Sequence, residues 1–129
     1  MSDGTPQGAA LVQAMARLDW REYPGHFGGA LSKALVDAQN TGTRRVDFRI
    51  SHYAPAAFVE EHVHRVQEQI YYVTEGEGVL TLDGARHLMR PGDYVYVPPG
   101  VRHGFANTGT RGLVFFVITT PATDEEDAR

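Results

Sequence analysis

The feature that most constrains the fold is a change in hydrophobic periodicity near residue 44. From there apolar and polar side chains alternate with a period of two, which is the pattern of a half-buried β-strand. The alternation is clearest from Val46 to Ser51, and further strand-like runs lie at residues 58–64, 69–74, 79–82, 94–97 and 113–120. About six to eight short strands with turn signals between them predict an antiparallel sandwich or barrel.

Glycine and proline separate these runs and do not form one flexible block. The chain has 14 glycines and 7 prolines, several of them at residues 75–78, 90–93 and 98–100. The pair Asp83-Gly84 predicts a tight hairpin turn, because both residue types tolerate a positive φ angle. We therefore expect an all-β domain whose strands follow one another closely along the chain.

The N-terminal third lacks the alternation. Leu11, Met15 and Leu18 are spaced as i, i+4 and i+7, which predicts a short amphipathic helix over residues 9–18. Residues 30–39 fit either a strand or a helical turn. These patterns divide the chain into an N-terminal helix and extended arm (1–43), a barrel (44–120) and an acidic C-terminal tail (121–129).

Composition and charge argue against several classes of protein. The net charge is −4, but residues 123–129 contribute −3 of it, so the body is nearly neutral and lacks the basic face of a nucleic-acid-binding protein. The absence of cysteine excludes a disulfide scaffold, a thiolate metal site and a cysteine nucleophile. No run approaches the ~18 apolar residues of a membrane helix, and residues 1–7 do not resemble a secretory signal. We expect a cytoplasmic protein with a solvated acidic tail.

Two histidines stand two residues apart in a strand-like run. His62 and His64 should share one strand face, because side chains alternate along a strand. Gln69 could return to that face where the next strand begins, and His103 follows the break at residues 98–100. Three imidazoles and one oxygen donor suit zinc, iron, nickel, copper or manganese. An isolated His-x-His is more often a pair of exposed polar residues, so the rest of the pattern decides.

The run from Gly92 to Asn107 resembles the second motif of the cupin superfamily, G-x5-P-x-G-x2-H-x3-N, and matches every fixed position. Residues 62–76 resemble the first motif, H-x-H-x(3 or 4)-E-x6-G, with glutamine in place of glutamate. The resemblance covers roughly residues 44–120. It implies a double-stranded β-helix, or jelly-roll, with a divalent transition metal (zinc, iron, nickel or manganese) inside the barrel.

Two positions depart from the cupin pattern. The glycine that opens the first motif is replaced by Ala56. The fourth ligand, usually glutamate, falls on Gln69 when counted from Gly76, with Glu68 as the alternative. Adjacent strand residues point to opposite faces, so one of the two reaches the metal. The resemblance therefore implies the ligand set His62, His64, Gln69 and His103, and it is nearest to small cupins with that set, including those that convert unsaturated uronates.

Other residues are candidates for chemistry or for substrate binding. Tyr71 is in phase with Gln69 and would serve as a hydrogen-bond donor or general acid, or would pack the barrel wall. Glu60 would act as a base if it shared the face of His62, or would lie at a solvated rim. Arg49 and Arg65 are conceivable carboxylate anchors. The apolar run 113–120 is either core or an intersubunit sheet, and the resemblance favours a homodimer.

These observations favour a metal-dependent enzyme that acts on a small, oxygen-rich and anionic substrate. Because glutamine is neutral, the ion would keep its full charge and act as a strong Lewis acid for isomerisation, ring opening or elimination. One alternative is an iron-dependent dioxygenase. Another is a cupin that binds a small ligand without catalysis.

Overall fold

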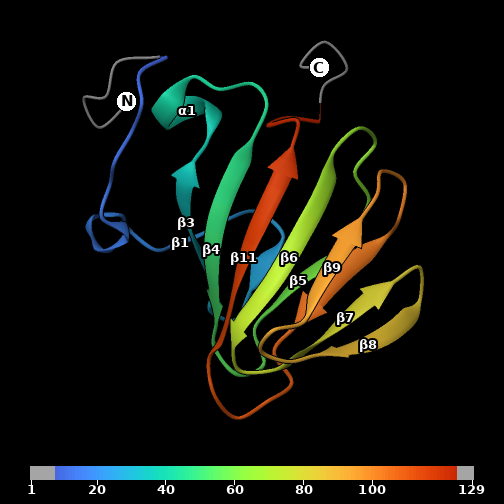
Figure 1. The fold of residues 1–129 in the computed structure, drawn as a ribbon. Coiled ribbons are helices and arrows are strands. Elements are labelled where there is room, and N and C mark those ends of the chain that lie inside the picture. Colours follow the sequence, from blue (N-terminus) through green and yellow to red (C-terminus); the bar gives the residue numbers. More distant parts are fainter. Residues whose placement is uncertain (1–7, 125–129) are drawn as a thin grey trace.

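The short alternating runs form two antiparallel sheets that face each other (Figure 1). The structure is a computed structural model, which describes residues 8–124. One sheet has six strands in the order β1-β3-β4-β11-β6-β9, and the other has five in the order β2-β5-β10-β7-β8. Their bounds are β1 (Arg21–Glu22), β2 (His26–Phe27), β3 (Ala30–Val36), β4 (Asp47–Tyr53), β5 (Phe58–His62), β6 (Glu68–Glu75), β7 (Gly78–Leu82), β8 (Ala85–Met89), β9 (Tyr94–Val97), β10 (His103–Ala106) and β11 (Leu113–Thr120).

The core lies between the sheets at one end of the barrel. Tyr53, Tyr71, Phe105 and Phe115 are almost fully buried there. Their ring centroids lie 4.8–6.3 Å apart, within the range of favourable aromatic pairs. The expected all-β jelly-roll architecture is confirmed, and this aromatic cluster forms the floor on which the candidate site is built.

Strand β4 turns its polar side chains inward. Asp47, Arg49 and Ser51 line the cavity between the sheets. Phe48 faces outward and stacks on Phe116 of β11, with ring centroids 5.5 Å apart. The interior therefore combines an aromatic floor with a polar wall, which is the arrangement of a binding cavity and not of a closed core.

The N-terminal helix expected over residues 9–18 is wrong. That segment contains only a 3-10 turn, η1 (Met15–Arg17), and the residue before it, Ala14, makes no side-chain cap. A helix of ten residues is marginal without such support. Leu11, Met15 and Leu18 instead face Leu35, Val36 and Phe48 across an apolar groove, so the segment reaches the sheet in an extended form.

The ambiguity at residues 30–39 resolves into a strand followed by one helical turn. β3 pairs with β4, so the six-stranded sheet begins before residue 44. It is followed by α1 (Ala38–Thr41), where Asp37 and Asn40 form a reciprocal capping box and Gly42 ends the turn at φ 76°. No helix within residues 8–124 is long and apolar enough to cross a membrane.

The turns confirm one local prediction and explain one departure from the cupin pattern. Asp83 and Gly84 have φ angles of 46° and 85° and join β7 to β8 as a tight hairpin. Ala56, which replaces the motif glycine, has a φ of 73°. An L-residue in this left-handed region is destabilised by about 1–2 kcal/mol.

We expect Ala56→Gly to raise the free energy of unfolding by about 0.5–1 kcal/mol, because relief of the left-handed strain exceeds the entropy that glycine adds to the unfolded chain. Denaturant titration measures the change. The control is Ala54→Gly, where the φ angle is not positive and glycine should lower stability. An Ala56→Gly protein no more stable than the original would contradict the strain.

Candidate metal centre

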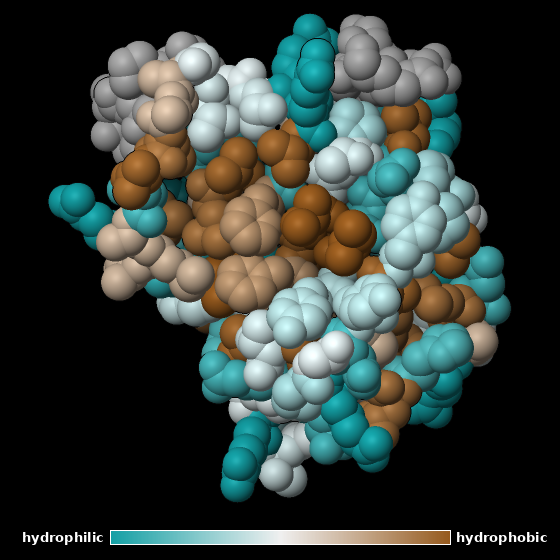
Figure 2. Space-filling view, viewed as in Figure 1, coloured by the Kyte–Doolittle hydropathy of each residue, from teal (hydrophilic) through white to brown (hydrophobic). Residues whose placement is uncertain are grey.

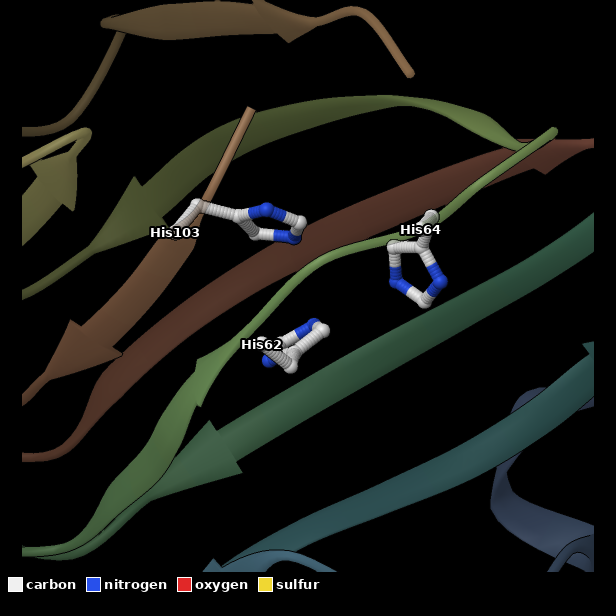
Figure 3. A group of neighbouring side chains, drawn as sticks. All are labelled: His62, His64 and His103. Atoms are coloured by element: carbon white, nitrogen blue, oxygen red, sulfur yellow. The ribbon is translucent and has the colours of Figure 1, made fainter. Parts of the chain in front are cut away.

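The side chains of three histidines, on and just beyond the neighbouring strands β5 and β10, converge (Figure 3). His62 ends β5, His64 lies two residues further along the chain, and His103 begins β10 directly opposite His62 in the ladder. One nitrogen from each ring lies within 4.8 Å of the other two. The spacing predicted from the sequence therefore does bring the three imidazoles together, and such a triad could hold a metal ion.

Backbone carbonyls fix the orientation of two of these rings. Nδ1 of His62 lies 2.7 Å from the carbonyl oxygen of Glu60, and Nδ1 of His103 lies 2.9 Å from that of Val101. A carbonyl only accepts, so each Nδ1 carries the proton and donates. In the neutral imidazole this leaves Nε2 as a bare lone pair directed at the centre, which is how metal-binding histidines are commonly held.

Gln69 is buried beside the triad, and its amide is hydrogen-bonded to the neighbouring strand β11. Its Nε2 donates to Oγ1 of Thr119 at 3.0 Å. Its Oε1 lies 2.8 Å from Nε2 of His103. With the His103 proton on Nδ1, its bare Nε2 faces the Gln69 amide, whose oxygen in this orientation is free to bind a cation alongside Nε2, and whose NH2 group would donate to Nε2 if the amide were turned over. Glu68 is exposed, so of the two candidates Gln69 is the one that faces inward.

His64 adds a second unsatisfied atom. Its Nε2 is buried without a hydrogen-bond partner, which is uncommon because buried polar atoms are normally paired. Its Nδ1 lies 3.6 Å from Oδ2 of Asp124. The bare Nε2 could bind a cation, while the carboxylate of Asp124 near Nδ1 orients the ring, as is common for metal-binding histidines.

Asp124 is the residue that sequence reasoning missed. Its carboxylate accepts from the backbone N–H groups of Arg65, Val66 and Gln67 at 2.7–3.0 Å. The Gln67 side chain in turn donates to the carbonyl of Pro121 at 3.1 Å. Residues 121–124 of the supposedly solvated tail thus hold the loop that carries His64, while residues 125–129 lie outside the described part of the chain.

Burial favours the neutral form of two of the imidazoles, those of His64 and His103. It lowers the pKa of His103 to about 4, an effect strengthened by His62 and His64. Burial also lowers the pKa of His64, together with the neighbouring His62. For Asp124 burial acts in the opposite sense, but the three backbone N–H groups outweigh it and the pKa falls. At neutral pH His64 and His103 therefore present uncharged nitrogens next to the ionised carboxylate of Asp124.

The cavity beside the triad has a volume of about 230 Å³, below the ~300–1,000 Å³ of drug-sized sites. His62 lines it from the five-stranded sheet, and Gln69, Tyr71 and Arg49 line it from the six-stranded sheet. Tyr71 is buried with its ring centroid 6.2 Å from that of His103, and burial raises its pKa. Its hydroxyl therefore stays protonated at neutral pH.

Glu60 does not share the inner face of His62. The β5–β10 ladder pairs His103 with His62 and Phe105 with Val59, so β5 has one extra residue between the two pairs. This bulge reverses the alternation, because it leaves Val59 buried and Glu60 exposed outside the cavity. Of the two positions considered for Glu60, the structure favours the exposed one.

Known proteins resemble this chain over much of its length. Residues 49–119, more than half of the chain, match the family model described as a cupin domain. Among curated proteins, the dimethylsulfoniopropionate lyase DddW of Ruegeria pomeroyi is 29% identical over 69% of this chain and 57% of its own length. The oxalate-binding protein of Thermotoga maritima is 33% identical over 50% of this chain and 53% of its own. Quercetin 2,3-dioxygenase of Bacillus subtilis is 32% identical over 61% of this chain and 23% of its own.

Solved structures extend the likeness to the whole fold. A predicted oxalate decarboxylase from Thermotoga maritima superposes with a TM-score of 0.78 over 86% of this chain and 99% of its own, at 23% identity. KdgF from Halomonas sp. has a TM-score of 0.74 over 94% and 100%, at 20% identity. The chain spans between about half and just under two thirds of the first curated relatives it matches. On its sequence and its fold, the chain belongs to the cupin family.

Proposed function

We propose that Nε2 of His62, His64 and His103, together with Oε1 of Gln69, bind one divalent transition ion. The observation that carries this proposal is the convergence of the three imidazoles, one nitrogen of each lying within 4.8 Å of the other two, with the Gln69 amide 2.8 Å from Nε2 of His103. The orphaned Nε2 of His64 supports it. A cation would satisfy all of these atoms at once, whereas protonation of His103 is disfavoured because burial lowers its pKa to about 4.

The protein is then a metal-dependent enzyme for a small, oxygen-rich anion, with isomerisation, ring opening or elimination as the reaction class. The bound ion supplies the positive charge that polarises a carbonyl or hydroxyl oxygen. All four ligands are neutral, and on the cavity wall the charges of Asp47 and Arg49 cancel through their ion pair. The charge of the ion therefore gives the cavity its attraction for anions.

Tyr71 is the chain's own donor in this proposal. Burial holds its hydroxyl in the protonated form, so it can donate a hydrogen bond to a ligand oxygen and stabilise charge that develops there. Glu60 takes no part because it is exposed outside the cavity. DddW is named as a lyase, which supports an elimination class.

The test is turnover by the purified protein after metal removal and reloading with zinc, nickel, manganese or iron. We expect activity on a panel of uronates, 2-keto acids and diketones, without oxygen and with more than one metal. Activity that needs iron and consumes oxygen would favour a dioxygenase, to which the quercetin 2,3-dioxygenase relative lends support. Binding without turnover would favour a ligand-binding cupin, as the oxalate-binding relative suggests.

Asp124→Ala should weaken metal binding about 10- to 100-fold, as loss of an outer-shell carboxylate typically does. The three backbone N–H groups of residues 65–67 lose their acceptor and His64 loses its neighbour. Competition with a chelator measures the dissociation constant. The matched control is Asp93→Ala, which removes a similar carboxylate–backbone bond from a distant turn. Equal affinities in the two variants would refute a role for Asp124.

We also propose that the protein forms a homodimer through the outer face of the six-stranded sheet. Figure 2 shows apolar side chains gathered over β4, β11 and β6. Ile70, Tyr72 and Ile118 are 36–46% exposed there, near the stacked pair Phe48–Phe116. Ile118→Asp should convert the dimer into a monomer in sedimentation velocity, because it buries a charge in the interface. Leu88→Asp, on the other sheet, should not. A monomeric original protein would exclude the dimer.

A further inference from the structure

Arg49 is held rigidly on the cavity wall, but only some of its N–H donors form hydrogen bonds. Its Nε and Nη2 donate to the two carboxylate oxygens of Asp47 at 2.7 and 3.0 Å. The guanidinium carbon lies 4.4 Å from the centre of the Tyr23 ring. One edge and one face of the guanidinium are thus fixed. A guanidinium has five N–H donors, and Asp47 occupies two of them, so the edge formed by Nη1 and the remaining N–H of Nη2 has no partner within residues 8–124.

The sheet register places Arg49 on the same face of the six-stranded sheet as Gln69 and Tyr71, two strands away. Arg49 pairs with Val117, which pairs with Tyr71 on β6. Each such row of paired residues crosses β4, β11 and β6. In the neighbouring row Asp47 pairs with Thr119, which pairs with Gln69. The backbones of β4 and β6 are therefore two strand spacings apart, about 9–10 Å. The side chains of these rows line the same cavity, with the hydrogen-bonded pair Ser32–Ser51 beside them.

We propose that the free edge of Arg49 binds a carboxylate at the far end of a ligand whose near end occupies the metal centre. The planar fork of a guanidinium matches the two oxygens of a carboxylate. Asp47 and Tyr23 orient that fork in advance, so little conformational freedom is lost on binding. This inference rests on the proposed function and narrows its substrate class to small acids with two oxygen-bearing ends, such as dicarboxylates and oxo or hydroxy acids.

An ion pair that served only to stabilise the barrel would also hold Asp47 and Arg49 together. The two roles differ in ligand selectivity. A structural pair treats a dicarboxylate and a monocarboxylate of equal length alike, whereas a binding edge prefers the dicarboxylate. Oxalate, whose two carboxylate carbons are bonded directly to each other, is too short to reach from the metal centre to Arg49 and reports on the metal centre alone.

The test measures dissociation constants of the zinc-loaded protein by calorimetry for oxalate and for two pairs of equal length, succinate with butyrate and glutarate with valerate. We expect at least one dicarboxylate to bind about tenfold or more tightly than its partner, as a charge-assisted bidentate contact allows. The variant is Asp47→Asn/Arg49→Gln, which removes both charges together and leaves neither one buried alone. In it the preference should vanish, while the affinities for oxalate and butyrate stay unchanged.

The control is Arg102→Gln, which removes an exposed arginine paired with Glu61 and should keep the preference. A dicarboxylate preference that survives in Asp47→Asn/Arg49→Gln, or that is missing from the original protein, would overturn the inference. Failure of oxalate to bind the zinc-loaded protein would instead count against the proposed function. If succinate or glutarate still bound through Arg49 in that case, a carboxylate site at Arg49 would stand, but its link to a metal centre would not.

Discussion

Replacing His62 and His64 together by alanine is expected to lower metal affinity by more than about 100-fold, beyond the loss of a single outer-shell partner. The variant removes two of the three converging imidazoles. Both side chains are only half-buried, so the barrel should still fold. Elemental analysis after dialysis measures the metal content, and far-UV circular dichroism checks the fold.

His87→Ala is the matched control, because His87 is an exposed histidine on β8. It should keep the metal content of the original protein. Full metal occupancy in the folded double variant would mean that the triad is not the binding site.

Gln69→Glu is expected to retain metal and to reduce turnover about tenfold or more. Glutamate offers a donor of similar shape, but its negative charge lowers the net charge of the site by one and weakens the polarisation of a bound oxygen. Thr119, whose hydroxyl now accepts from the amide of Gln69, can donate to a carboxylate at the same place. Metal content, turnover and the affinity for oxalate are measured together.

Gln69→Leu separates the two roles of this residue, since it removes the oxygen donor without adding charge. It should weaken metal binding, whereas Gln69→Glu should not. If the protein only binds its ligand, Gln69→Glu lowers anion affinity and there is no turnover to lose. Unchanged anion affinity in a Gln69→Glu protein that keeps its metal would show that the uncompensated charge is not what the site uses.

Much of the fold could be predicted because it depends on local periodicity. Alternation with a period of two indicated the strands, and Asp83-Gly84 marked its hairpin because both residues adopt a positive φ. The convergence of His62, His64 and His103 followed from strand geometry together with the cupin motifs. The strands and the hairpin need only short-range information, whereas the meeting of His103 with His62 and His64 was implied by the cupin resemblance.

The side that a strand presents to the interior did not follow from periodicity. In β4 the polar residues Asp47 and Arg49 face the cavity and Phe48 faces outward, the reverse of an ordinary core strand. In β5 a bulge has the same result, because it leaves Val59 facing the interior and Glu60 facing outward. One extra residue leaves no mark in composition, yet it reverses every side chain up to the next irregularity.

The role of Asp124 could not be predicted because its partners are distant in the sequence. Its partners, the N–H groups of residues 65–67, precede it in the sequence by 57 to 59 positions. It also lies in an acidic run of the kind that is ordinarily solvated. The signal that could have found it is the backbone of residues 65–67. A short loop between two ligand-bearing strands needs an acceptor for its N–H groups.

X-ray absorption spectroscopy of the zinc-loaded protein tests the central claim most directly, because it reports the atoms bound to the ion. The account predicts one zinc per chain with a first shell at ~2.0–2.2 Å and the multiple-scattering pattern of three imidazoles. His62→Ala/His64→Ala should lose that pattern. A first shell of oxygen alone, or an imidazole pattern that is unchanged in the double variant, would contradict a metal centre built from His62, His64 and His103.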